Sequence, residues 1–187
     1  MVETLRPKVE SSFLQRYYPD NIDTKSLYCT AKHPAERIGR HLQYKHYLLE
    51  KLLPLIQGLN PHPYLIAAGY SMGVYYTVNL TFRHPHLFGK VLGLSRHYDL
   101  TQPMATFRDL FRSYVNEAVY LHTPNRFLAN LTGNCYLTSL RWLKITLAVG
   151  ANGVFLTNNQ FLSQLLHRKG INHQLHVWVD EAHAPPT

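Results

Sequence analysis

A serine between two glycines is the feature of this sequence with the most chemistry. Ser71 stands between Gly69 and Gly73, after the short apolar run "YLIAAG" and before a helical pattern. A serine hydroxyl becomes a useful nucleophile when a base takes its proton and the chain holds it exposed. A sharp strand-to-helix turn does the second task, and its tight geometry leads us to expect both glycines. The backbone N–H of Met72 would then face a developing oxyanion from the start of a helix.

Two further polar residues follow runs that are typical of buried strands. Asp99 comes after "KVLGLS" (90–95), and His183 comes after "HQLHVWV" (173–179). Ligands of parallel sheets bind beyond the carboxyl ends of the strands, so we expect Ser71, Asp99 and His183 to lie on the same edge. His183 is the candidate base, and Asp99 is a candidate acid.

The pattern of apolar residues predicts the elements that position these side chains. Apolar residues recur at three- and four-residue steps from Pro34 onwards, which predicts a long helix. Short apolar runs predict strands, and Pro85 ends a helical pattern. In chain order we expect helix 34–57, strand 64–69, helix 72–84, strand 90–95, helical pieces within 104–143, strand 144–150, helix 158–170 and strand 173–179.

Strands that alternate with helices predict an α/β fold with a mostly parallel central sheet and right-handed crossovers. The length of 187 residues fits a single domain, 1–187. Within it we expect an irregular N-terminal segment, 1–32, with at most one strand, and a helical insert at 101–143.

The composition excludes several classes of protein. The net charge is +8, but the longest basic run is the pair Arg168-Lys169, so we expect no nucleic-acid partner. No apolar stretch has the length of a membrane span. The two cysteines, Cys29 and Cys135, have no metal-ligand spacing, and the N-terminal stretch lacks the apolar core of a signal peptide. We therefore expect reduced cysteines and a cytoplasmic protein.

Three stretches carry a resemblance to a known family. "GYSMGVYYTVNLTFRHPHLFGKVLGLSRHYDL" (69–100) resembles the core of the α/β-hydrolase superfamily, in its esterase D-like branch. "HPAERIGRHLQYKHYLLEKLLPLI" (33–56) resembles the helix before that core, and "LSQLLHRKGINHQLHVWVDEAH" (162–183) resembles the closing helix, strand and histidine loop. The resemblance covers about residues 20–184 and implies a three-layer α/β-hydrolase-like sandwich.

The resemblance also implies an activity and its residues. It implies hydrolysis of a small ester by a serine–acid–histidine triad, with no metal and no organic cofactor. Ser71 becomes the nucleophile, His183 the base and the N–H of Met72 one oxyanion donor. The other histidines that we considered are interpreted as surface or packing residues: His33, His41, His84, His86 and His97.

The acid departs from the family pattern. Relatives carry an aspartate in the loop after the third predicted strand, but "VGANGVFLTNN" (149–159) holds no carboxylate, and Asn152 and Gly153 stand at the expected position. Asp99 is one replacement, because some lipases of the superfamily place their acid after the preceding strand. Its alternative interpretation is a turn residue. Asp180 and Glu181 are further candidates, although sequence neighbours of a histidine seldom orient it.

The two ends of the sequence and the loop that contains Arg96 also differ from the family pattern. Relatives begin with further strands, among which lies the loop of the second oxyanion donor, and they continue beyond the histidine into a final helix. Fewer strands here would leave a sheet edge exposed. We expect that a second copy of the chain covers this edge, or that the chain is a shortened family member. Arg96 stands where relatives have a small residue.

Two functions remain open from the sequence. The first is a carboxylesterase-type serine hydrolase that acts through Ser71 and His183. The alternative is a catalytically weak or inactive relative that serves as a binding or interaction module.

Overall fold

The computed structural model describes residues 2–11, 14–20, 22–94, 98–103 and 108–179. Its centre is one sheet of four parallel strands in the order β1-β2-β3-β4. The strands are β1 (Ile66–Tyr70), β2 (Lys90–Leu94), β3 (Lys144–Gly150) and β4 (His173–Trp178). The predicted α/β fold, its parallel sheet and all four strands are thereby confirmed.

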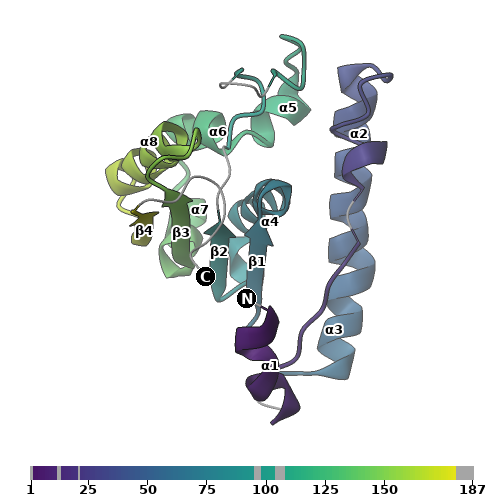
Figure 1. The fold of residues 1–187 in the computed structure, drawn as a ribbon, viewed down its shortest axis with the longest axis vertical. Coiled ribbons are helices and arrows are strands. Elements are labelled where there is room, and N and C mark those ends of the chain that lie inside the picture. The colour runs from purple at the N-terminus through teal and green to yellow at the C-terminus, as the bar shows by residue number, and fades with distance from the viewer. Residues whose placement is uncertain (1, 12–13, 21, 95–97, 104–107, 180–187) are drawn as a thin grey trace.

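Helices connect the strands and precede them (Figure 1). They are α1 (Val2–Glu10), the 3₁₀ turn η1 (Asp23–Lys25), α2 (Pro34–Tyr47), the π turn η2 (Leu48–Leu52), α3 (Leu53–Leu59), α4 (Met72–Arg83), the 3₁₀ turn η3 (Pro85–Leu87), α5 (Glu117–Leu121), α6 (Pro124–Asn130), α7 (Asn134–Trp142) and α8 (Leu156–Arg168). Residues 1–32 were expected to be irregular, but they contain α1 and η1.

The long helix predicted over 34–57 is continuous but contains a π turn. The Leu53 N–H bonds to the carbonyl of Leu48, five residues back, and the next residue is Pro54. Proline has no N–H that could donate to the carbonyl four residues back. The helix therefore contains one turn with π-type hydrogen bonds, which span five residues, at this point. The helix then passes through Gly58, its predicted end, to Leu59.

The core is divided into two clusters. The larger one packs aliphatic side chains of α4, α6, α7 and α8 against β2 and β3, and includes Val78, Val91 and Leu162. The smaller one joins α2, α4 and α5 and is rich in aromatic rings, such as Tyr75 and Tyr76. Figure 1 shows α2 and α3 standing beyond β1, apart from the helices that cover β3.

The sheet has two edge strands in the described part of the chain. β1 pairs only with β2, and β4 pairs only with β3. Ile66 and Tyr70 of β1 and Val177 of β4 remain exposed. The prediction of an exposed edge is therefore confirmed, whereas a second copy that covers it stays a prediction.

Candidate active site

Ser71 occupies a strained turn between β1 and α4. Its backbone has φ 50° and ψ −126°, a region that a residue with a side chain seldom adopts. Two hydrogen bonds hold this conformation: the Ser71 N–H donates to the carbonyl of Leu94 on β2, and the Ser71 carbonyl accepts from the N–H of Val74, both at 3.0 Å. Strain that the surrounding structure enforces is typical of functional turns.

The two glycines of the motif have different surroundings. A Cβ on Gly69 would lie 2.4 Å from the carbonyl carbon and oxygen of Gly73, so only glycine fits at position 69. A Cβ on Gly73 would meet nothing within 4 Å. The expected lack of space therefore applies to Gly69 and is wrong for Gly73.

Met72 is the first residue of α4, and its side chain is buried. The first N–H groups of a helix lack partners within the helix and form the positive end of its dipole. The Met72 N–H therefore stands where it could stabilise negative charge on an oxygen bound beside the Ser71 hydroxyl.

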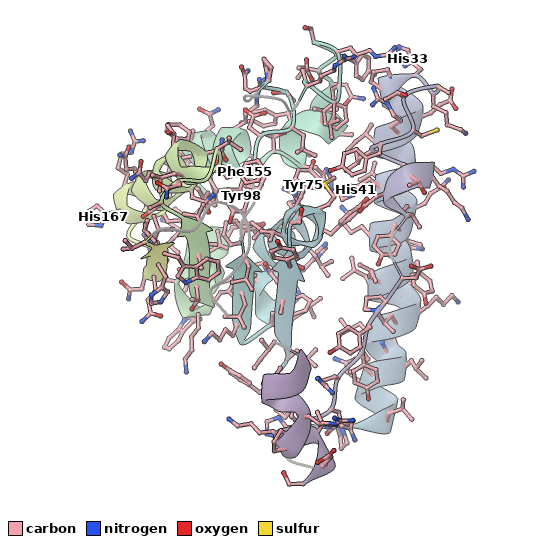
Figure 2. All side chains as sticks on the ribbon, viewed as in Figure 1. His33, His41, Tyr75, Tyr98, Phe155 and His167 are labelled. Atoms are coloured by element: carbon pink, nitrogen blue, oxygen red, sulfur yellow. The ribbon has the colours of Figure 1, made fainter. Side chains whose placement is uncertain are left out.

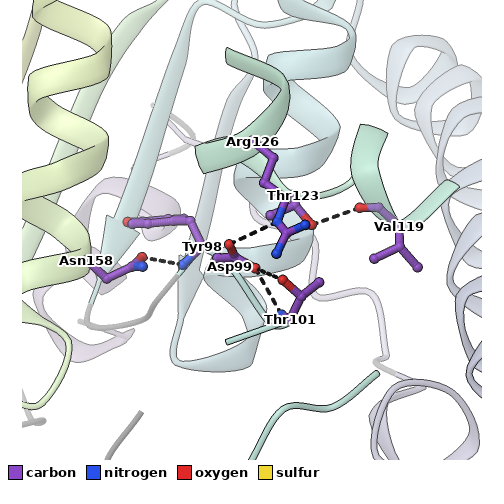
Figure 3. Close-up of polar contacts among 7 residues, drawn as sticks. All are labelled: Tyr98, Asp99, Thr101, Val119, Thr123, Arg126 and Asn158. Carbon is purple, nitrogen blue, oxygen red and sulfur yellow. Dashed lines mark hydrogen bonds and ion pairs between the residues drawn. The ribbon is translucent and has the colours of Figure 1, made fainter. Parts of the chain in front are cut away.

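Asp99 follows β2 and is only 8% exposed. Its Oδ1 accepts from the Thr101 N–H at 3.0 Å and from the Thr101 hydroxyl, and its Oδ2 accepts from Arg126 Nε at 3.2 Å (Figure 3). A carboxylate has about four acceptor positions, so these three donors leave roughly one. Asp99 thus links α6 of the insert to the end of β2 through Arg126, and about one acceptor position of its carboxylate remains for another donor.

The segment that lacks a carboxylate supplies asparagines instead. Asn152 is exposed. Asn158 Oδ1 accepts from the Tyr98 N–H at 2.7 Å (Figure 3), and Asn159 Oδ1 accepts from the Tyr98 hydroxyl at 3.2 Å. The start of α8 therefore holds the backbone next to Asp99. No sequence pattern pointed to these asparagines or to Arg126.

Several candidates lie outside the described residues. His183, Asp180 and Glu181 fall in 180–187, and Arg96 and His97 fall in 95–97. Their positions relative to Ser71 stay predictions.

His41 and His122 form a buried histidine cluster next to Tyr75 of α4. His41 of α2 is 2% exposed, its ring centroid lies 5.5 Å from that of Tyr75 (Figure 2) and 5.2 Å from that of His122, and neither ring nitrogen has a hydrogen-bond partner. Lys45 Nζ lies 3.0 Å from His122 Nε2. Burial, with nearby Lys45, lowers the pKa of His41 well below its usual value and that of His122 to about 4. Both rings are therefore neutral near pH 7.

Two surface hollows lie away from the serine. One of ≈ 560 Å³ lies between the start of α2 and the loop before α5, and one of ≈ 500 Å³ lies along α8. Ser71 lines neither of them.

The described part of the chain contains neither a metal-binding cluster nor a membrane-spanning helix. Within it, no three histidine, cysteine, aspartate or glutamate side chains gather closely enough to hold a metal ion. Nor does any helix there combine the length and the apolar character that a membrane crossing requires.

Comparison with known families gives a match over most of the chain. A family described as "Putative esterase" matches residues 10–177. The chain belongs to this esterase family. No curated protein sequence matches the chain.

Solved structures of the α/β-hydrolase type share the fold of this esterase-family chain. A ferulic acid esterase superposes with a TM-score of 0.60 at 21% identity, over 75% of this chain and 54% of the other. The Staphylococcus aureus fluorophosphonate-binding serine hydrolase F gives 0.57 at 18%, over 75% and 57%. An S-formylglutathione hydrolase from Agrobacterium tumefaciens gives 0.56 at 11%, over 74% and 50%. The chain thus spans about half the length of these proteins, and the predicted α/β-hydrolase-like fold is confirmed.

Proposed function

We propose that the chain is a carboxylesterase-type serine hydrolase that cleaves a small ester. Ser71 attacks the carbonyl carbon, His183 takes the hydroxyl proton and returns it to the leaving alcohol, and the N–H of Met72 stabilises the oxyanion. The single observation that carries this proposal is the strained backbone of Ser71 at the strand-to-helix turn. Membership of the esterase family supports the same chemistry.

Asp99 is our proposed acid of the triad. Its support is its place after β2, its burial and the acceptor position that its three hydrogen-bond donors leave open. Its carboxylate would hold His183 in the correct tautomer and stabilise the imidazolium ion.

The alternative, a weak or inactive relative that binds a partner, is favoured by two observations about the carboxylates. Residues 149–159 hold no carboxylate, and Asp99 is already paired with Arg126. If Asp99 serves only this ion pair, His183 has no acid and turnover is strongly reduced.

One experiment separates the two functions. The purified chain is treated with a fluorophosphonate probe, the labelled residue is located by peptide mass mapping, and turnover of p-nitrophenyl acetate is measured. We expect labelling at Ser71 and turnover that falls by about 10³-fold or more in Ser71→Ala and His183→Ala. Turnover that is equal in the wild type and in Ser71→Ala would exclude the esterase and support the binding module.

We further propose that a second copy of the chain covers the open edge of β1. Unpaired edge strands are templates for pairing with another chain. Light scattering should then give the mass of a homo-oligomer, and the mass of a monomer would count against this proposal.

A further inference from the structure

A second serine, Ser163, contacts a histidine of β4, which lies at the opposite edge of the sheet from the β1 strand that precedes Ser71. Ser163 Oγ on α8 lies 2.7 Å from His173 Nε2 at the start of β4, and both side chains are partly buried. The other ring nitrogen, His173 Nδ1, lies 3.0 Å from the carbonyl oxygen of Ile171.

These two distances assign the protons. A carbonyl oxygen only accepts, so Nδ1 of the neutral ring carries the hydrogen and donates it to Ile171. Nε2 is then left with its lone pair, and the Ser163 hydroxyl must be the donor in the short contact. A nucleophile bonded to a base that a third group orients is the signature of an activated serine.

A tight connection between α8 and β4 builds this pair. Gly170 has φ +65°, the left-handed conformation that ends many helices, and the Ile171 N–H returns to the carbonyl of Leu166 at 3.0 Å. The chain therefore reverses at once, which brings His173 beside Ser163, ten residues earlier.

The pair opens into a surface hollow. Ser163 and His173 line the ≈ 500 Å³ hollow together with Gln164, His167 and Arg168. Figure 2 shows His167 on the outer side of α8, away from Tyr75 and His41. An incoming ester can therefore reach Ser163 without passing Ser71.

We propose that Ser163 is a second nucleophilic serine, which accepts the acyl group of activated aryl esters. Ser163 Oγ bonds to the carbonyl carbon as the bond from that carbon to the aryl oxygen breaks. The hydroxyl proton passes to His173 Nε2 and then to the departing phenolate, so the products are an O-acyl serine and a phenol.

The modification is stoichiometric. Ser163 lies inside α8, where backbone N–H groups bond within the helix, so unlike Ser71 it has no helix N-terminus beside it to stabilise an oxyanion. Both acylation and deacylation are therefore slow. An activated aryl ester loses a good leaving group, whereas the acyl serine is an ordinary alkyl ester, so water releases the acyl group more slowly than the aryl ester delivers it and the acylated serine accumulates.

The test uses the Ser71→Ala protein, so that acylation at the elbow cannot contribute. It is incubated with p-nitrophenyl acetate, and the acetylated residue is located by peptide mass mapping. We expect one acetyl group, on Ser163, and acetylation about 100-fold slower when His173→Asn removes the base. Ser163→Ala should abolish it.

Ser139 provides a matched control. It is also a helical serine, on α7, but its hydroxyl donates to the backbone carbonyl of Cys135 rather than to a histidine. Ser71→Ala protein that is unmodified at Ser163, or acetylated equally at Ser139 and Ser163, would overturn the proposal, and neither result needs a variant at position 163 or 173 to fold.

The outcome is independent of the proposed hydrolase. Loss of turnover in Ser71→Ala tests the esterase, whereas acetylation of Ser163 in that same variant tests the second serine. Either can fail while the other holds.

Discussion

Ser71 and Ser163 each have a different feature of a nucleophilic serine. Ser71 has the backbone of a nucleophile, with a strained φ of 50° and the first N–H groups of α4 next to it. Ser163 has a base, with His173 Nε2 at 2.7 Å, but it sits on a regular helix without an oxyanion site. The comparison separates two requirements of serine catalysis: stabilising the oxyanion and removing the proton.

The difference follows from where each serine lies on its helix. At a helix N-terminus the backbone N–H groups are free to bind an anion, whereas in the interior they are used by the helix itself. We therefore expect turnover at Ser71 and a single, lasting acylation at Ser163. Three further experiments sharpen or break this distinction.

The largest effect is expected from the carboxylate that only Ser71 would use. Asp99→Asn should lower kcat/KM for p-nitrophenyl acetate by about 10⁴-fold, the loss seen when a serine protease triad loses its acid charge. Acetylation of Ser163 should be unchanged, because His173 is oriented by the Ile171 carbonyl.

Arg126→Met is the matched control for Asp99. It removes the same ion pair and keeps most of the side-chain stem. A partly exposed pair contributes about 1 kcal/mol, which corresponds to about fivefold in a rate, so turnover should fall by about fivefold at most. Equal losses in the two variants would mean that Asp99 only fastens α6 to the sheet.

The next effect concerns the backbone that distinguishes Ser71. Gly69→Ala places a Cβ 2.4 Å from the backbone of Gly73, and we expect the free energy of unfolding to fall by about 3 kcal/mol. Gly73→Ala meets open space in the first turn of α4, and should leave that free energy unchanged or raise it by about 0.5 kcal/mol. Denaturant titration measures both, and equal values would contradict the close approach at Gly69.

The last effect is a dependence of stability on pH, which is small for each step in pH. His41 and His122 are buried; His41 lies near His122 and Lys45, and His122 lies near Lys45, Arg83 and His84. Burial also lowers the pKa of His84 itself. The pKa values of His41 and His122 are lowered on folding, so the unfolded chain binds more protons below pH 6.5. The free energy of unfolding is therefore unaffected above that pH, and it falls below it by about 1.4 kcal/mol per pH unit for each histidine. For His122 the fall ends near its folded pKa of about 4.

Denaturant titrations between pH 7 and 4 measure this slope. His122→Gln should reduce it, since one titrating ring is gone. A slope that His122→Gln leaves unchanged would show that the buried cluster behind Ser71 does not cause the loss.

Local patterns predicted most of the regular elements. Strand 144–150 coincides with β3, because a continuous apolar run marks a strand buried in a parallel sheet. Helix 72–84 is α4 within one residue, because the residue before Pro85 disfavours helical backbone. The elbow turn at Ser71 was predicted for the same reason: its glycine spacing and its flanking elements are local.

Contacts between distant segments were not predictable in this way. Asp99 was a candidate acid by its position after a strand, but its partner Arg126 lies 27 residues later. The amide contacts from Asn158 to the Tyr98 backbone span 60 residues. Sequence spacing does not predict such contacts, because they form only when separate segments of the chain pack against one another.

The sequence by itself determined the parallel α/β fold and the strand-to-helix turn at Ser71, because these depend on apolar periodicity and on short motifs. The esterase family came from the resemblance of whole stretches to known members. Only the tertiary structure decided that Gly69 rather than Gly73 is sterically required, that Asp99 is paired with Arg126, and that His173 faces Ser163. Each of these depends on which side chains meet when separate elements pack, and packing is a property of the whole chain.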